Sequence, residues 1–192
     1  NGLLVTEDFA VGATIDPPSL NGGTIAWTSP LALNNGLQFT GGALTSGTLD
    51  IAGNSAQSAL MTVSNTTINT SGNYDLSLPS GNAFSGGGSV FNNSGNLVKS
   101  SSGVVSFNIV LNNSGTVTVQ NGTLSLTTGG TIGGALATAN GAVLELANNY
   151  TIANGTSFSG AGLISLRDNT TTTVSGTITN NGNILLNSTG SF

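Results

Sequence analysis

Residues 92–98 read Asn-Asn-Ser-Gly-Asn-Leu-Val, and residues 112–118 read Asn-Asn-Ser-Gly-Thr-Val-Thr, 20 positions later (92 to 112). A shortened third copy, Asn-Asn-Gly-Asn-Ile-Leu-Leu, spans residues 180–186. A turn-like unit that is followed by strand-forming residues and recurs with a period near 20 is typical of solenoid proteins. The repeat therefore predicts a β-solenoid with coils of about 20 residues.

The stretches that follow these turns alternate apolar side chains with hydroxyl or other polar ones. Thr-Val-Thr-Val at 116–119 and Thr-Leu-Ser-Leu at 123–126 are the clearest cases. Such alternation places one set of side chains inside a sheet structure and the other outside. The side chains expected to point inward are Val117, Val119, Leu124, Leu126, Leu144, Leu146, Ile164, Leu166 and Ile178.

The turns between the strands are rich in asparagine and glycine. Asn-Gly pairs at 121–122, 140–141, 154–155 and 181–182 precede strand-like stretches and are expected to supply positive φ angles at corners. Because Asn-Gly is also a strong hairpin signal, a β-sandwich built from hairpins is the alternative fold. Glycines 122, 141 and 162 open strands about one coil apart, which favours stacking. The expected fold is a right-handed parallel β-helix, the usual hand of parallel crossovers.

The composition points to an ordered extracellular protein. Gly, Asn, Ser and Thr make up 105 of the 192 residues, only 5% of residues are charged, and 37% are hydrophobic, enough to form a core. The net charge of −5 and the two cations, Lys99 and Arg167, provide no basic patch for nucleic acid or anionic lipid. No apolar stretch is long enough for a membrane-spanning helix. A surface of Ser, Thr and Asn rather than Lys and Glu is more typical of extracellular scaffolds, so the composition predicts a secreted or cell-surface protein.

Residues 1–30 differ from the rest of the chain, because they contain Trp27, three of the four prolines and an acidic pair. They are expected to form an N-terminal cap or a variant first coil. Residues 31–192 are expected to form the body of the solenoid, which can belong to a longer chain.

The stretch from Gly81 to Gly190 contains the phrases Asn-Asn-Ser-Gly-Thr-Val and Gly-Thr-Leu-Ser-Leu. In these phrases it resembles the passenger domains of bacterial autotransporters and adhesins similar to filamentous haemagglutinin. The resemblance covers somewhat over half of the chain and implies a parallel β-helix displayed on a bacterial surface. It transfers no functional residue, because the shared unit is a turn and a strand.

The residues that usually carry catalysis are scarce. The chain contains neither histidine nor cysteine, so Ser-His-Asp and Cys-His catalysis and ordinary zinc sites are not expected. Asp50 and Asp75, 25 residues apart, are the carboxylates that neighbouring coils could bring together as a glycosidase pair. We expect instead that Asp50 and Asp75 each point outward into solvent. The seven carboxylates are Glu7, Asp8, Asp16, Asp50, Asp75, Glu145 and Asp168. The prediction is therefore no enzyme, no catalytic or metal site, and no cofactor.

Three functions remain as hypotheses. The first is a structural or adhesive extracellular protein, a β-helical stalk or filament subunit that self-associates through its ends. The second is a module that binds or cleaves surface glycans, with Trp27, Tyr74 and Tyr150 as a candidate aromatic platform. The third is an ice-binding solenoid that uses the Thr-x-Thr units at 116/118, 171/173 and 177/179. The asparagines themselves are expected to stack as amide ladders at the corners.

Overall fold

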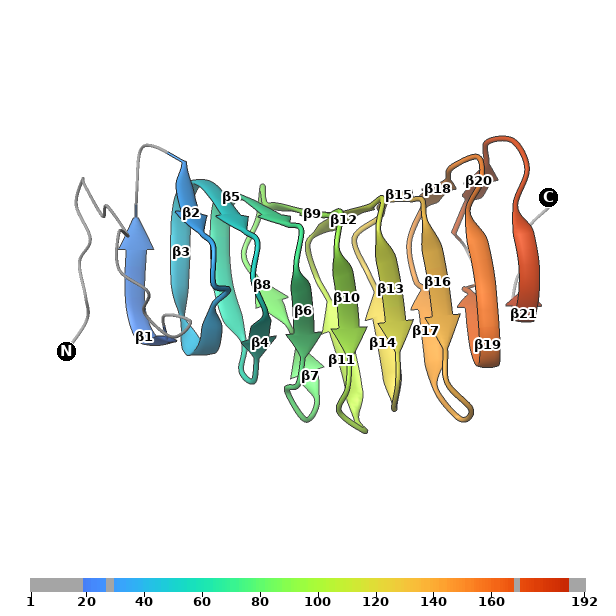
Figure 1. Ribbon diagram of the computed structural model, residues 1–192, viewed down its shortest axis with the longest axis horizontal. Helices are drawn as coiled ribbons and strands as arrows, with labels where there is room; N and C mark the ends of the chain where they lie inside the picture. Colours follow the sequence, from blue (N-terminus) through green and yellow to red (C-terminus); the bar gives the residue numbers. More distant parts are fainter. Residues whose placement is uncertain (1–18, 27–29, 168–169, 187–192) are drawn as a thin grey trace.

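A computed structural model describes residues 19–26, 30–167 and 170–186 of the chain. Within them the protein is all-β: 21 strands follow one another along the chain without a helix, and every strand pairing is parallel. Figure 1 shows the strands side by side along the long axis of the molecule, from β1 at one end to β21 at the other. The fold is a β-solenoid of about 8 turns, as predicted, and the β-sandwich alternative is wrong.

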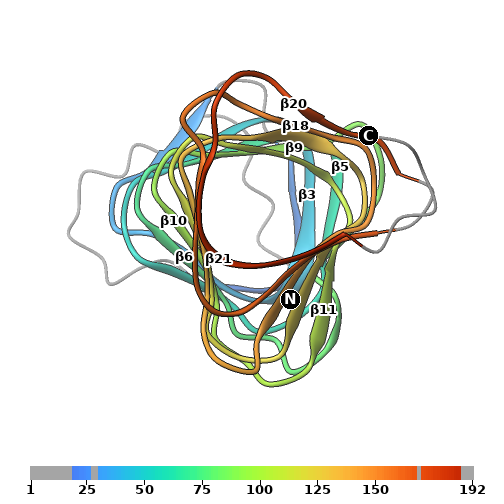
Figure 2. The same cartoon turned by 90° about the vertical axis from the view of Figure 1, so that its right-hand side faces the viewer.

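Each turn of the solenoid contributes to three sheet faces, which superpose when the molecule is viewed along its axis (Figure 2). Face 1 is formed by β4 (Ser55–Gln57), β6 (Asn73–Leu76), β10 (Asn96–Lys99), β13 (Thr116–Val119) and β16 (Ala135–Thr138). Face 2 is formed by β7 (Gly81–Asn82), β8 (Phe84–Ser85), β11 (Val104–Phe107), β14 (Thr123–Leu126) and β17 (Val143–Leu146). Face 3 is formed by β2 (Leu31–Leu33), β9 (Val90–Asn93), β12 (Val110–Asn113), β15 (Gly130–Ile132), β18 (Tyr150–Ile152) and β20 (Thr172–Val174).

Five longer strands continue around a corner from one face to the next, and β3 continues around two corners over all three faces. Their bounds are β1 (Ser19–Ala26), β3 (Gln38–Ile51), β5 (Met61–Thr70), β19 (Ser157–Leu166) and β21 (Thr179–Leu186). The strands β19 and β21 pair along both face 1 and face 2, with one register shift between Gly160 and Leu163. Regular stacking thus extends from the first described strand to the last.

The coil length varies slightly around the predicted 20 residues. Along one column of face 3, successive stacked residues are 19, 23, 20 and 19 positions apart. The two Asn-Asn-Ser-Gly units are equivalent, because Asn92 pairs with Asn112 and Asn93 with Asn113. The third copy is not equivalent: Asn180 stacks on Phe158, on face 1. The sequence similarity at residues 180–186 therefore reflects turn-forming composition, and these residues do not occupy the same position in the coil.

The core is a continuous apolar stack inside the three faces. The inward residues predicted from alternation are buried from Val117 to Ile164, and Leu166 and Ile178 are partly buried against the core. In the middle coils the core is aromatic, and ring centroids lie 4.8–5.9 Å apart in edge-to-face or tilted geometry. These rings belong to Tyr74, Phe84, Phe91 and Phe107.

Part of the segment predicted as a cap belongs to the solenoid. The strand β1 pairs in parallel with β3 and is therefore a coil strand. The remainder of residues 1–30, apart from Pro30, lies outside the described residues, and Trp27 is part of it.

Glycine at the corner of the Asn-Asn-Ser-Gly unit is required by close approach of successive coils. A Cβ built on Gly115 would lie 2.1 Å from the backbone oxygen of Gly95, and one on Gly95 would lie 2.1 Å from that of Gly72. Neither Gly95 nor Gly115 has a positive φ. Of the four predicted Asn-Gly corners, Gly122, Gly141 and Gly155 have the expected positive φ, and Gly182 does not. The corner therefore excludes any side chain, because the preceding coil occupies its space.

Gly115→Ala is expected to lower the free energy of unfolding by about 2 kcal/mol or more, because the added methyl group must push two coils apart. Urea unfolding followed by circular dichroism measures the loss. Gly87→Ala is the matched control, since its Cβ would meet nothing within 4 Å and its φ is not positive. Equal losses in the two variants would contradict the close-approach explanation.

Candidate functional site

An outward column of amides runs along face 3. Asn69 Nδ2 donates to Asp50 Oδ1 at 2.7 Å, Asn92 Nδ2 donates to Asn69 Oδ1 at 2.8 Å, and Asn112 Nδ2 donates to Asn92 Oδ1 at 3.1 Å. The column ends where the backbone N–H of Thr131 donates to Asn112 Oδ1 at 3.2 Å. All donors point toward the N-terminal end, so the Asp50 carboxylate accepts from the donor end of an aligned row of dipoles.

A second, buried ladder lies directly beside the first, one residue further along each strand. Thr70 Oγ1 donates to Asn93 Oδ1 at 3.0 Å, and Asn93 Nδ2 donates to Asn113 Oδ1 at 2.7 Å. The amide of Asn113 then donates to the backbone oxygen of Gly133 at 2.5 Å. This ladder runs in the opposite direction to the outward one. The predicted stacking of asparagine amides is confirmed, and it occurs twice at the same corner.

The two ladders border a groove of about 470 Å³, a volume within the usual range of ligand sites. We call it the asparagine groove; its lining residues are Asn69, Asn92, Asn93, Ser94, Asn112, Asn113, Ser114 and Thr131. The lining comes from four successive coils and consists of amides and hydroxyls. The sequence analysis did not identify the groove, although the repeated Asn-Asn-Ser unit contributes most of its lining.

The structure separates the two carboxylates that could have formed a glycosidase pair. Asp50 lies on face 3, where the residue of the next coil is Asn69, 19 residues later. Asp75 lies on face 1, between Ala56 and Val98. A spacing of 25 residues exceeds the local coil length, so the second carboxylate lies around the corner on another face. Asp75 Oδ2 instead accepts from Ser100 Oγ at 2.9 Å.

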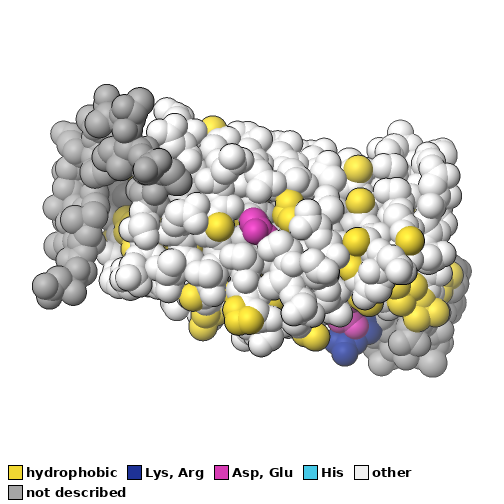
Figure 3. All heavy atoms as spheres, turned by 60° about the horizontal axis from the view of Figure 1, so that its bottom comes forward, with side chains coloured by type: hydrophobic (Ala, Val, Ile, Leu, Met, Phe, Trp, Pro, Cys, Tyr) yellow, Lys and Arg dark blue, Asp and Glu magenta, His cyan; other side chains and the backbone are white. Residues whose placement is uncertain are grey.

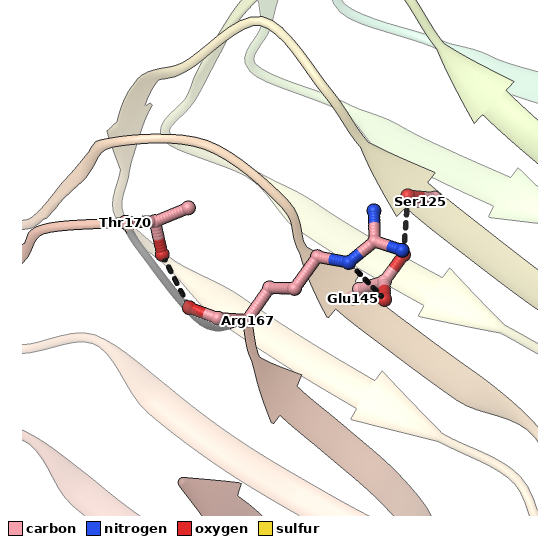
Figure 4. Close-up of polar contacts among 4 residues, drawn as sticks. All are labelled: Ser125, Glu145, Arg167 and Thr170. Carbon is pink, nitrogen blue, oxygen red and sulfur yellow. Dashed lines mark hydrogen bonds and ion pairs between the residues drawn. The ribbon is translucent and has the colours of Figure 1, made fainter. Parts of the chain in front are cut away.

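The charged groups that the structure describes elsewhere are engaged in local contacts. Glu145 Oε1 lies 3.4 Å from Arg167 Nε, and Glu145 Oε2 accepts from Ser125 Oγ at 2.5 Å (Figure 4). The side chain of Lys99 is buried, and its Nζ donates to the backbone oxygen and the hydroxyl of Ser101 and to the backbone oxygen of Asn121. Glu7, Asp8, Asp16 and Asp168 lie outside the described residues.

The aromatic platform predicted for glycan binding is wrong for both tyrosines. Tyr74 and Tyr150 are at most 2% exposed and belong to the core. Burial raises the pKa of each phenol. The Tyr74 hydroxyl donates to Gln57 Oε1 at 2.9 Å inside the solenoid.

The Thr-x-Thr units do not form a ladder of their own kind. Thr116 stacks between Asn96 and Ala135, and Thr118 stacks between Val98 and Ala137. A single threonine column does occur on face 3, where Thr131, Thr151 and Thr173 continue the outward asparagine column. Thr173 of this column belongs to the 171/173 unit, whereas Thr116 and Thr118 lie outside the column.

Comparisons with protein-family models, with curated proteins and with solved structures found no match. Within residues 19–26, 30–167 and 170–186, the chain forms no apolar helix of the length that crosses a membrane.

Asn93→Ala is expected to lower the free energy of unfolding by about 3 kcal/mol, because it leaves several buried polar groups without a partner. The neighbouring Asn92→Ala removes an outward amide and is expected to cost about 1 kcal/mol or less. Urea unfolding of both variants measures the difference. A larger loss for Asn92→Ala would contradict the assignment of the inner and outer ladders.

Lys99 gives the protein a pH dependence with a defined sign. Burial lowers the pKa of Lys99 below its ordinary value of 10.5, although nearby Asp75 partly opposes the shift. Between the folded and unfolded pKa values the unfolded chain binds more protons, so stability rises with pH in that window. The stability of the wild type relative to Lys99→Met should therefore increase as the pH approaches 10.5. Urea midpoints of both proteins along a pH series test this, and a constant difference would contradict it.

Proposed function

We propose that the chain is a structural and adhesive segment of an extracellular protein. In this proposal it is a β-helical stalk or filament subunit that associates through the end of its solenoid and presents a neutral polar surface. A secreted or cell-surface location, on a bacterium, belongs to the same proposal. No reaction is assigned to it.

The character of the surface supports a presenting role. Figure 3 shows one face of the molecule, on which neutral polar side chains and backbone predominate and charged groups occur at only two places. Within the described part of the chain, no three side chains of the metal-ligating types His, Cys, Asp and Glu gather in one place. The described carboxylates, Asp50, Asp75 and Glu145, instead contact asparagine, serine and arginine, as expected of groups that stabilise a scaffold.

The observation that carries the proposal is the exposed core at the last described coil of the solenoid. Val174 is 47% exposed, whereas Ile152, beneath it in the same inward column, is 1% exposed. Leu186 is 50% exposed, whereas Leu146, two coils earlier in its column, is fully buried. These side chains occupy core positions but have no further described coil to pack against.

The backbone of the last described strands also lacks a further described partner. Among the described strands, β20 pairs only with β18, and β21 pairs only with β19. The outer edge of each thus offers N–H and C=O groups to another parallel strand. An apolar patch combined with a free strand edge fits a further coil, and a second copy of this chain can supply one.

Leu186→Lys is expected to abolish concentration-dependent association of the 192-residue chain, because a charge in the end of the core cannot be buried against another coil. Sedimentation velocity over a range of protein concentrations measures association. Leu60→Lys is the matched control, since Leu60 is an exposed leucine of similar exposure (45%) between face 1 and face 2, away from the solenoid ends. A wild type that stays monomeric throughout, or equal effects of both variants, would contradict end-to-end assembly.

A further inference from the structure

We infer that the asparagine groove is a binding site for a linear, uncharged polysaccharide that lies along the solenoid axis. This inference deepens the adhesive part of the proposed function and rests on it. It does not depend on association through the solenoid end, which involves other residues.

The first argument is the hydrogen-bonding capacity left over in the outward ladder. A side-chain amide has two N–H donors and a carbonyl oxygen with two lone pairs. Asn92 uses one N–H to reach Asn69 and one lone pair to accept from Asn112. Each amide in the middle of the ladder therefore has one N–H and one lone pair that the ladder bonds do not use. A donor beside an acceptor is the pattern that neighbouring hydroxyl groups of a sugar can satisfy.

The second argument is pre-organisation. The ladder bonds hold the amides of Asn69, Asn92 and Asn112 in one orientation, and the buried amides of Asn93 and Asn113 support the wall behind them. Side chains that are already ordered lose little conformational entropy when a ligand binds. The groove can therefore bind a flexible chain without first ordering itself.

The third argument is charge. None of the residues that line the groove is ionisable. Lys99 is buried in the core, and Arg167 pairs with Glu145 outside the lining, so neither cation lies at the groove. Asp50, at one end of the ladder, adds a negative charge that disfavours uronates, sulfates and phosphates. The site therefore fits an uncharged polymer of hydroxyl groups.

The fourth argument is the repeat. Stacked strands place equivalent amides about 4.8 Å apart along the axis, and the lining extends over four coils. A ligand that repeats along its length can use each coil in turn, so weak contacts add up as they do in multivalent binding. A hollowed site that is concave and repetitive fits a polymer chain better than it fits a flat ice surface.

The test uses the 192-residue chain and four defined probes. Cellohexaose and maltohexaose represent linear neutral glucans, and polygalacturonate and heparin represent anionic polysaccharides. Binding is measured by isothermal titration calorimetry and by affinity electrophoresis in gels that contain the polymers. We expect binding to at least one neutral glucan and none to the anionic polymers. Binding only to the anionic polymers, or to none of the four, would overturn the inference.

Two matched pairs of variants locate the binding. Thr131→Trp fills the groove and is expected to weaken the affinity for the neutral glucan by about tenfold. Thr151→Trp places the same ring at the next coil of the same exposed column, outside the lining, and should leave the affinity unchanged. Equal losses in both variants would place the binding elsewhere.

The second pair of variants replaces asparagines by threonine, which removes the amide groups and keeps a polar side chain that strands accept. Asn92→Thr with Asn112→Thr deletes two groove amides, whereas Asn73→Thr with Asn96→Thr deletes the bonded amide pair of face 1. Only the first double variant should lose binding. Ice recrystallisation inhibition that is lost in Thr131→Trp, with no glucan binding by the wild type, would instead assign the face to ice. In each of these outcomes sedimentation of the wild type reports separately on end-to-end assembly, so the two proposals can fail independently.

Discussion

The parallel hydrogen bonds between each coil and the next are the constraint on which the whole structure depends. They hold neighbouring strands about 4.8 Å apart, so a side chain in the middle of the solenoid has a neighbour in the coil before it and in the coil after it. This spacing explains why asparagine meets asparagine, as between Asn92 and Asn112, and why the corner at Gly115 has no room for a Cβ. The amide contact and the exclusion of a Cβ therefore both recur from one coil to the next.

Buried polar groups add specificity to a core that is otherwise apolar. The inner ladder of Asn93 and Asn113 is satisfied only when the coils are aligned as they are, since a shift by one residue would turn these amides outward. Lys99 and Gln57 likewise reach particular backbone oxygens from inside the solenoid. The cost of leaving any of these groups unbonded penalises other registers. Apolar stacking drives the collapse, and the polar contacts select one alignment.

The same stacking creates both surfaces to which we assign a role. Where stacking stops among the described residues, the core at Val174 and Leu186 is left exposed beside free strand edges. Where stacking continues along face 3, the outward amides form a row with unused donors and acceptors. Neither surface contains a reactive group, so both proposals concern binding. Because each neutral contact is weak, a surface with few charges depends on repeated contacts for its binding affinity.

Much of the fold could be predicted from the sequence, because the repeat length, the alternation and the stacking of asparagine are local properties. The burial of Val117 and Leu124 follows directly from alternation, and the coil length follows from the repeated Asn-Asn-Ser-Gly unit. Three-dimensional position could not be predicted where the coil length varies. Asp50 and Asp75 lie on different faces of the solenoid. Residues 180–186 resemble the Asn-Asn-Ser-Gly unit in sequence but lie on a different face. A residue's face depends on the summed lengths of the loops before it, which local patterns do not report. The sequence by itself therefore determined that this chain is a solenoid, and only the tertiary structure decided which side chains meet in the groove and which core positions remain open.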